Sequence, residues 1–379
     1  TANTTLLRSL FHMGIPVSGK NIFPSNIKGL PTWFSIRVSK DGYLARVAHD
    51  DIIVQMNPMT FEEDIKYNIS GGVVFYADHI DMSIERDDVI VYPMPVKDLI
   101  EEADVPRNLR DYMQNMVYVG IVSQMLGIKL DVIHESLLSQ FKKKTSVAES
   151  NYEIVKLAAD WAKYNLEKKD KYHIEQMPSL DGYIMADGNT AGALGAIYGG
   201  FQFCGWYPIT PATSLAESLN IFAPKLRKDP DTGKNNFAIV QAEDELASIG
   251  MAVGAGWAGL RSMTSTSGPG ISLMTEYMSL AYFAEVPLVL WDVQRVGPST
   301  GLPTRTGQGD LIQNYFLGHG DTRQIVIIPS SVSECFEFGW KAFDIADQFQ
   351  TPVIILSDLD LGMNLWMTKA FEYPDSPMD

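Results

Sequence analysis

The second half of the chain alternates between short runs typical of buried strands and longer stretches typical of helices. Runs at residues 237–241, 261–266, 287–293, 324–328 and 352–356 predict strands, and stretches at 191–204, 243–257, 271–285 and 332–349 predict helices. These strands lack a regular polar–apolar alternation, so both of their faces are expected to be buried, as in a parallel sheet. The strand–helix order therefore predicts a doubly wound, mostly parallel α/β domain.

The first half has a less regular pattern. An alternating stretch at 35–38, an apolar stretch at 73–76 and a helix at about 111–126 predict a separate α/β layer. A charged segment at 136–178 predicts a solvated helical linker that Pro178 ends. We therefore expect a first domain at 1–135, the linker at 136–178, and a second domain at 179–379. The chain begins without Met inside an amphipathic stretch, so we expect a cropped N-terminus.

Composition limits the classes of function. The chain has 379 residues, of which 46% are hydrophobic and 20% charged, as in an ordinary globular protein. Its net charge of -16 argues against nucleic-acid binding, which needs a basic surface. No apolar run reaches the roughly 20 residues of a membrane span. We expect a cytoplasmic protein that binds neither membranes nor nucleic acid.

The potential metal ligands are few. Cys204 and Cys335 lie in apolar stretches that resemble helices, and we expect both to be buried free thiols. Two thiols cannot hold an iron–sulfur cluster, which needs about four thiolates. The six histidines are scattered without the spacing of metal ligands. We therefore expect no metal site built by this chain alone.

The segment 207–213 joins a predicted strand to a helix and supports two interpretations. Thr210 can serve as the N-cap and Pro211 as the first residue of the following helix, which is a purely structural role. Alternatively, the Thr210 hydroxyl and the helix N-terminus face an anionic substrate group such as a carboxylate. The residues alone leave both interpretations open.

The acidic segment 243–245 also stands between a strand and a helix. Acidic residues in a first helical turn offset the helix dipole, and this explains Asp244 and Glu245. Glu243 lies at the C-terminal end of the strand, where sites open in doubly wound folds. A carboxyl group there can form a hydrogen bond with a ring nitrogen of a cofactor, so Glu243 is a candidate site residue.

Arg295 ends an apolar strand, and a loop rich in Gly, Pro and Thr follows at 296–310. Loops of this length in compact folds are usually functional. A guanidinium group is suited to bidentate capture of a carboxylate. The alternative is an Arg side chain that merely extends from the edge of the sheet into solvent.

Residues 14–21 nearly match a phosphate-binding P-loop. However, Asn21 replaces the hydroxyl residue, Pro16 lies inside the loop, and the preceding segment is typical of a helix. We therefore do not expect a P-loop. Lys20 and Lys28 remain candidates for phosphate contacts.

Several segments resemble 2-oxoacid:ferredoxin oxidoreductases. WYPITP at 206–211, EDE at 243–245, TSTSGPG at 264–270 and GPSTGLPT at 297–304 are similar to the pyrimidine-binding domain of that family. GKNIFPSNI at 19–27 and GLPTW at 29–33 are similar to its gamma domain. The order resembles the two-subunit 2-oxoglutarate enzymes. It implies an N-terminal gamma-type domain, then a thiamine pyrimidine-binding domain, with the family's C-terminal domain missing.

The resemblance also implies residue roles. Glu243 matches the glutamate that contacts N1′ of the thiamine aminopyrimidine, where a carboxyl group favours the tautomer that removes the thiazolium C2 proton. Thr210 and Arg295 match positions that bind the carboxylate and keto group of the oxoacid. The resemblance adds Tyr207 and Arg305 as substrate contacts, Ile209, Ser267 and Gly268 as cofactor contacts, and Lys20 and Lys28 as contacts of coenzyme A.

The function implied by the resemblance is CoA-dependent oxidative decarboxylation of 2-oxoglutarate to succinyl-CoA, with electrons passed to ferredoxin, or the reverse carboxylation. A beta subunit would hold most of the thiamine diphosphate, its Mg²⁺ and a [4Fe-4S] cluster, in a dimer of alpha–beta heterodimers. Thiamine diphosphate enzymes typically hold Mg²⁺ through a Gly-Asp-Gly segment followed by an Asn-Asn pair. The similar residues here, Asp187 and Asn235, are too far apart in the sequence to form this motif. The alternatives are pyruvate or a branched-chain oxoacid as substrate, a non-redox thiamine diphosphate enzyme, and a non-catalytic binding module.

Overall fold

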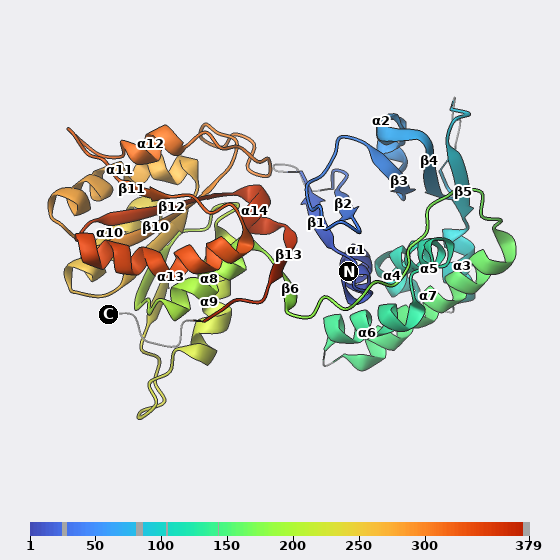
Figure 1. Ribbon diagram of the computed structural model, residues 1–379, viewed down its shortest axis with the longest axis horizontal. Helices are drawn as coiled ribbons and strands as arrows, with labels where there is room; N and C mark the ends of the chain where they lie inside the picture. Colours follow the sequence, from blue (N-terminus) through green and yellow to red (C-terminus); the bar gives the residue numbers. More distant parts are fainter. Residues whose placement is uncertain (25–28, 81–85, 104, 143, 374–379) are drawn as a thin grey trace. The chain divides into compact units, whose positions relative to one another are not determined.

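The computed structural model describes residues 1–24, 29–80, 86–103, 105–142 and 144–373 (Figure 1). The chain divides into two compact units. Unit 1 comprises Thr1–Gly19 and Gly29–Asp181, and unit 2 comprises Lys20–Lys28 and Gly182–Asp379. A short segment from the first half of the sequence therefore belongs with the second unit.

Unit 1 combines helices with a small parallel sheet. Its elements are α1 (Ala2–His12), β2 (Trp33–Val38), β3 (Asp50–Gln55), α2 (Phe61–Tyr67), β4 (Asn68–Ala77), β5 (Ile90–Met94), α3 (Val96–Glu102), α4 (Arg110–Met113), α5 (Asn115–Leu126), α6 (Leu130–Phe141) and α7 (Thr145–Asn165), and β1 (Val17–Ile22) leads into unit 2. Strands β3, β4 and β5 pair in parallel in that order. The α/β layer predicted for the first half is confirmed.

The predicted solvated linker at 136–178 is wrong, because this stretch belongs to unit 1. Helix α7 buries a stripe of small and aliphatic residues that includes Ile154, Val155 and Ala158. It approaches α5 so closely that a Cβ on Gly120 would clash with the backbone carbonyl of Val155. The many charged residues of this segment conceal the stripe in the sequence because they occupy the other faces of the helix.

Unit 2 is built around a six-stranded sheet. Its elements are β6 (Tyr183–Ala186), α8 (Gly188–Tyr198), β7 (Phe203–Trp206), α9 (Thr213–Leu226), β8 (Ala238–Gln241), α10 (Glu245–Trp257), β9 (Ser262–Thr266), α11 (Gly268–Phe283), β10 (Leu288–Gln294), α12 (Leu311–Tyr315), β11 (Ile325–Ile327), α13 (Val332–Phe349), β12 (Pro352–Asp358), α14 (Leu359–Met363) and β13 (Leu365–Lys369). The strand order is β11-β12-β10-β9-β7-β8, and each neighbouring pair is parallel. The predicted doubly wound fold is therefore confirmed.

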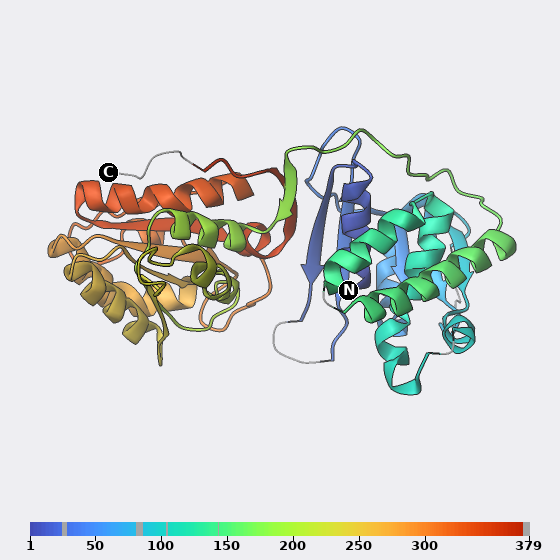
Figure 2. The same cartoon turned by 90° about the horizontal axis from the view of Figure 1, so that it is seen from below.

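Helices cover both faces of this sheet (Figure 2). On one face, α8, α9 and α13 pack over a core that contains Trp291 and Val293 of β10. On the other face, α10 and α11 pack over Leu288 and Leu290 of the same strand. Because successive strand residues point to opposite faces, β10 contributes to both cores. This burial explains the largely apolar run, broken only by Asp292, that predicted the strand.

Two details of unit 2 differ from the prediction. The helix expected at 191–204 ends at Tyr198, since Gly199 and Gly200 follow and Gly200 adopts a φ of +79°; Cys204 therefore lies in β7. Strand β8, which was expected to be buried, is an edge strand with exposed residues. Both cysteines are nevertheless free and buried, as predicted.

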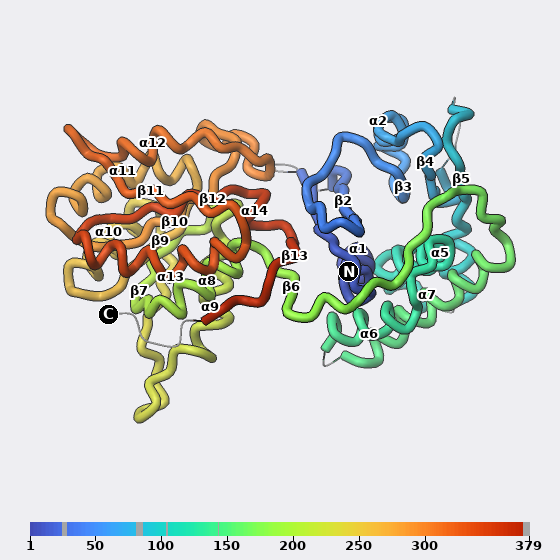
Figure 3. The backbone as a smooth tube through the Cα atoms, in the orientation of Figure 1, coloured from blue at the N-terminus to red at the C-terminus, as the bar shows by residue number. Residues whose placement is uncertain are grey.

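The connection between α9 and β8 is a hairpin-like excursion away from the sheet (Figure 3). An antiparallel bridge joins Lys228 to Asn235 at its base. Asn235 and Asn236 thus lie in this excursion, which supports the view that they form no Mg²⁺ motif with Asp187. Within the described part of the chain, none of the helices has the length and apolar character needed to traverse a bilayer.

Candidate functional site

The predicted site residues of unit 2 follow the C-terminal ends of parallel strands. Tyr207, Ile209 and Thr210 follow β7, Glu243 follows β8, Ser267 and Gly268 follow β9, and Arg295 and Arg305 follow β10. The carboxyl ends of parallel strands meet at one edge of the sheet, where doubly wound folds bind their ligands. The fold thus brings these four loops to the same edge.

Arg295 is the buried cation of this edge, with only 8% of its surface exposed. Its Nη1 donates a hydrogen bond of 2.6 Å to the carbonyl of Thr210, and its Nη2 donates bonds of 3.3 Å to the carbonyls of Ser299 and Thr300. Among the described residues its Nε has no partner and no carboxylate forms an ion pair with it. Burial lowers the pKa of Arg295, and the charge of Glu245 opposes that shift.

The structural interpretation of Thr210 as a helix cap is wrong. Helix α9 begins at Thr213 with Ala212 at its N-cap position, and no side chain caps it. Thr210 lies in the turn before the helix, and its carbonyl oxygen accepts the hydrogen bond from Arg295. The turn therefore positions Thr210 beside the guanidinium group, while the substrate contact of its hydroxyl stays a prediction.

The acidic segment after β8 divides into three environments. Glu243 is exposed in a bend, and Asp244 caps α10 by accepting a hydrogen bond of 2.6 Å from the amide of Ala247. Glu245 is partly buried, and its charge acts on Arg295. Its Cγ lies 3.0 Å from the position that a Cβ on Gly270 would occupy. Of these three acidic residues, Glu245 is the one whose charge acts on the guanidinium group of Arg295.

The sequence indicates that Glu245 lies on the buried face of α10, which the explanation by the helix dipole did not take into account. Glu245 precedes Ile249 by four residues and Ala252 by seven, and both of these side chains are buried on the inner face of α10. Residues at this spacing share one face of a helix. An acidic residue on an apolar stripe indicates a specific partner rather than a general effect on the helix dipole.

A pocket of about 410 Å³ opens beside Arg295. Its lining includes Gly268, Ser272, Asp310 and Gln313. A Cβ on Gly268 would lie 2.7 Å from Asp310 Oδ2, so only glycine allows this carboxylate to pack there. Burial raises the pKa of Asp310. The predicted cofactor contact Gly268 is thus a pocket residue, and the hydroxyl of Ser267 just before it is buried without a partner among the described residues.

A second acidic residue, Asp292, lies fully buried in β10 beneath this pocket. Asn314 of α12 donates a hydrogen bond of 2.7 Å to its Oδ2. Burial, reinforced by the nearby charge of Asp310, raises the pKa of Asp292 well above its ordinary value. Sequence analysis missed this residue, although an aspartate inside an apolar strand was a visible signal.

A larger pocket of about 800 Å³ lies at the opposite edge of the sheet. It is lined by the C-terminal ends of α8, α10 and α11 and by Arg227 and Arg261. Arg261 is already neutralised by Asp344 and Asp347, at 2.8 and 2.9 Å. Because none of the predicted site residues lines it, and ligands of such folds bind at the other edge, the smaller pocket is the candidate site.

Comparisons with known proteins show which family this chain resembles. Residues 194–366 match the sequence family described as pyruvate flavodoxin/ferredoxin oxidoreductase, thiamine diP-bdg, and residues 1–161 match that described as pyruvate ferredoxin/flavodoxin oxidoreductase. The alpha subunit of 2-oxoacid:ferredoxin oxidoreductase 1 from Sulfurisphaera tokodaii is 32% identical over 95% of this chain and 62% of its own length. This chain is a homologue of 2-oxoacid:ferredoxin oxidoreductase alpha subunits.

Two further relatives of this alpha-subunit homologue bear on its substrate. The 2-oxoglutarate synthase subunit KorA from Methanothermobacter marburgensis is 45% identical over 50% of this chain and 47% of its own length. The structure of 2-oxoglutarate:ferredoxin oxidoreductase from Magnetococcus marinus, with 2-oxoglutarate, coenzyme A and succinyl-CoA bound, superimposes with a TM-score of 0.85 at 31% identity, covering 98% of this chain and 63% of that one. The chain thus spans less than two thirds of the length of these relatives. The predicted family resemblance is confirmed.

The residues of this alpha-subunit homologue fit one end of thiamine diphosphate. The thiamine diphosphate-binding family region at 194–366 contains Thr210, Glu245 and Arg295. Glu245 offers a carboxylate for a ring nitrogen, and the half-buried Ile209 offers an apolar contact. In the described ranges no cluster of His, Cys, Asp and Glu side chains can hold a metal ion. The chain therefore offers groups that fit the aminopyrimidine ring.

The remaining predicted contacts lie elsewhere. Arg305 is exposed, and its Nη1 donates a hydrogen bond of 3.0 Å to the carbonyl of Phe23. Lys20 forms an ion pair of 3.0 Å with Asp360. Tyr207 is half-buried beside the turn that contains Thr210, and Lys28 lies outside the described residues. In the described part of the chain, Arg305, Lys20 and Tyr207 do not line the pocket beside Arg295. The ligand contacts predicted for these residues and for Lys28 stay predictions.

Proposed function

We propose that this chain is the larger subunit of a 2-oxoacid:ferredoxin oxidoreductase whose substrate is 2-oxoglutarate. The enzyme would oxidatively decarboxylate 2-oxoglutarate to succinyl-CoA with coenzyme A as cosubstrate and ferredoxin as electron acceptor, or run the reverse carboxylation. The names of the relatives and the ligands bound in the Magnetococcus marinus structure support this substrate. We expect the complex to be cytoplasmic.

The observation that carries the proposal is the environment of Arg295. A buried guanidinium group must be compensated, because an isolated charge is costly to remove from water. Its observed partners are carbonyl oxygens, which are neutral. The carboxylate of a 2-oxoacid would supply the missing negative charge, and its two oxygens match the fork of donors on the guanidinium group. The hydrogen bond from Arg295 to the carbonyl of Thr210 holds Thr210 beside the same guanidinium group.

Glu245 is the residue that we propose holds the aminopyrimidine ring. When bound, thiamine diphosphate supplies the carbon nucleophile that attacks the keto group of the oxoacid. The carboxylate of Glu245 would accept a hydrogen bond from the protonated ring nitrogen and so favour the reactive tautomer, in which that nitrogen carries a proton. Glu245 is partly shielded from solvent and acts electrostatically on Arg295, whereas Glu243 is exposed. The proposed ring contact and the proposed partner of the substrate carboxylate would then be two groups whose charges act on each other.

A partner chain would complete the site. Exposed apolar side chains follow the outer faces of α10 and α11, beginning beside Glu245. They are Leu246, Trp257, Leu273, Tyr277, Leu280 and Phe283. The spacing of the α11 residues is that of one helical face, and the edge strand β8 borders the same region. We propose that a beta subunit, which holds the diphosphate, Mg²⁺ and a [4Fe-4S] cluster, covers this face in a dimer of alpha–beta heterodimers.

The test uses the complex purified anaerobically together with its native partner. Reduction of a low-potential dye would be followed with coenzyme A and, in turn, 2-oxoglutarate, pyruvate and 2-oxoisovalerate. We expect reduction that requires both coenzyme A and an oxoacid, with 2-oxoglutarate preferred. If a preparation that retains iron and thiamine diphosphate reduces no dye with any of these acids, the proposal is wrong.

The two candidate glutamates are separated by matched variants. We expect Glu245→Gln to reduce kcat by at least about 100-fold, since general acid–base groups contribute about 10²–10⁴. Glu243→Gln removes a charge of the same kind two residues away, and we expect the kcat of this variant to stay within about threefold of the wild-type value. The reverse pattern would return the role to Glu243, as the sequence resemblance implies.

A further inference from the structure

The structure assigns a positioning role to Thr304, whose hydroxyl fastens the loop after β10 to the segment 20–24 and so holds Arg295 in place. The inference rests on the proposed function only for its effect on catalysis. The contacts that support it are present in the structure whatever the substrate is. They form a path from the segment 20–24 through Thr304 and the loop to the guanidinium group.

The loop at residues 296–305 closes on itself. The amide of Val296 donates a hydrogen bond of 3.0 Å to the carbonyl of Arg305, and the amide of Leu302 donates one of 3.0 Å to the carbonyl of Val296. Gly301 adopts a φ of +50°, and a Cβ there would clash with the Val296 carbonyl. The loop is therefore compact and closed by its own backbone hydrogen bonds.

Arg295 is anchored to the interior of this loop. Its Nη2 donates to the carbonyls of Ser299 and Thr300, and both distances are 3.3 Å. Hydrogen bonds from nitrogen to oxygen are usually shorter, near 2.9–3.0 Å. These two contacts are therefore weak, and the position of the loop relative to Arg295 depends on additional support.

That support comes from one backbone carbonyl of the segment 20–24. The carbonyl of Phe23 accepts a hydrogen bond of 2.8 Å from Thr304 Oγ1 and another of 3.0 Å from Arg305 Nη1. Thr304 is buried, whereas Arg305 is exposed and shares its Nη1 with the carbonyl and hydroxyl of Thr304. Because water competes less at a buried contact, the Thr304 hydrogen bond is the principal link.

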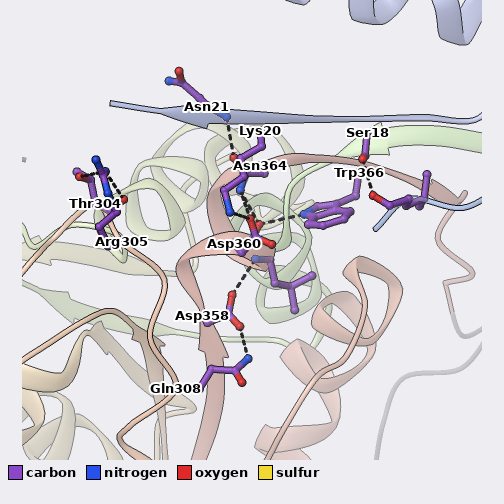
Figure 4. Close-up of polar contacts among 12 residues, drawn as sticks. Ser18, Lys20, Asn21, Thr304, Arg305, Gln308, Asp358, Asp360, Asn364 and Trp366 are labelled. Carbon is purple, nitrogen blue, oxygen red and sulfur yellow. Dashed lines mark hydrogen bonds and ion pairs between the residues drawn. The ribbon is translucent and has the colours of Figure 1, made fainter. Parts of the chain in front are cut away.

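The segment 20–24 is itself fixed to α14. Lys20 forms an ion pair of 3.0 Å with Asp360, and the amide of Asn21 donates a hydrogen bond of 3.1 Å to Asn364 Oδ1. Asn364 in turn donates a hydrogen bond of 2.7 Å to Asp360 Oδ1 (Figure 4). Helix α14 follows β12, the strand paired with β10 that leads into Arg295. The loop is thus held against the same sheet that supports the guanidinium group.

The experiment compares Thr304→Val with Thr304→Ser in the intact complex. Valine keeps the shape of the side chain without the donor, and serine keeps the donor. Thr306→Val is the matched control, since Thr306 is an exposed residue just beyond the loop. Amide hydrogen exchange of peptides covering 296–306 would be measured beside KM and kcat for the oxoacid. Thermal unfolding of each variant would confirm that it is folded.

We expect faster exchange over 296–306 in Thr304→Val and wild-type exchange in Thr304→Ser and Thr306→Val. We also expect Thr304→Val to raise KM about 2- to 10-fold, the range for one lost hydrogen bond, with kcat little changed. Unchanged exchange in Thr304→Val, or equal changes in valine and serine variants, would overturn the role of the hydroxyl. Faster exchange with an unchanged KM would overturn the link to Arg295. A wild-type complex inactive with every oxoacid would refute the proposed function, while the exchange measurement would still decide the role of Thr304.

Discussion

Two glycines of unit 2 should respond in opposite ways to the same substitution. Gly339 lies inside α13 where it faces α8, and Gly254 lies inside α10 on an open surface. A Cβ on Gly339 would lie 2.7 Å from the carbonyl oxygen of Gly192, whereas ordinary contacts begin near 3.4 Å. A Cβ on Gly254 would meet nothing within 4 Å. Both Gly→Ala substitutions gain the same helix propensity, so the difference between their effects on stability measures the contribution of packing.

The magnitude follows from these distances. Replacing glycine by alanine in a helix interior stabilises the helix by about 0.5–1 kcal/mol. At Gly339 the backbone carbonyl cannot rotate away, so α8 and α13 must separate, and overpacking of this kind costs about 1–3 kcal/mol. We therefore expect Gly339→Ala to lower the stability of unit 2 by roughly 0.5–2 kcal/mol. Gly254→Ala should raise it by roughly 0.5–1 kcal/mol.

Scanning calorimetry of the chain without its partner is the assay, because a partner could cover Gly254. For a unit of this size, 1 kcal/mol shifts Tm by about 2–4 °C. Gly339→Ala should then lower the Tm of the unit 2 transition by about 1–8 °C, and Gly254→Ala should raise it by about 1–4 °C. A Gly339→Ala protein at least as stable as the wild type, or shifts of equal sign, would refute the packing argument.

Three further predictions concern the site. Arg295→Ala should raise KM for the oxoacid more than it lowers kcat, because it removes a charge pair already present with bound substrate; an unchanged KM would count against this role. Thr210→Val should lower kcat/KM without lowering Tm, whereas a lower Tm with normal kinetics would indicate a structural role. Burial raises the pKa of Asp292, so the folded protein retains a proton that the unfolded chain releases above pH 4 or so, and its stability falls as pH rises. Asp292→Asn removes this titration, so urea unfolding should show the variant gaining stability relative to the wild type from pH 5 to pH 8, and a pH-independent difference would contradict it.

Local pattern determined much of unit 2. The helix predicted at 332–349 has the bounds of α13. The strand predicted at 237–241 differs from β8 by one residue at its start, and the strand predicted at 287–293 differs from β10 by one residue at each end. Their periodicity depends on neighbours in the sequence, and burial against a sheet imposes it directly. The same pattern located the candidate site, because parallel strands place their C-terminal loops at one edge.

Other features depend on contacts between residues far apart in the sequence. The burial of α7 depends on α5, and the exposure of β8 depends on its place at the edge of the sheet. The contact of Thr304 with Phe23 spans 281 residues. No local pattern encodes which distant groups will meet, so Lys20, considered alone, was a candidate for contacts with phosphate or coenzyme A rather than for its ion pair with Asp360.

Glu243 and Glu245 show most clearly what the local sequence determined and what the tertiary contacts determined. The sequence by itself determined that an acidic segment follows β8 at the ligand-binding edge. The tertiary structure decided that Glu243 faces solvent, Asp244 caps α10 and Glu245 is partly buried, where its charge acts on Arg295. Adjacent residues at a helix start point in directions about 100° apart, so the environment of each one is decided by the elements that the fold packs beside it.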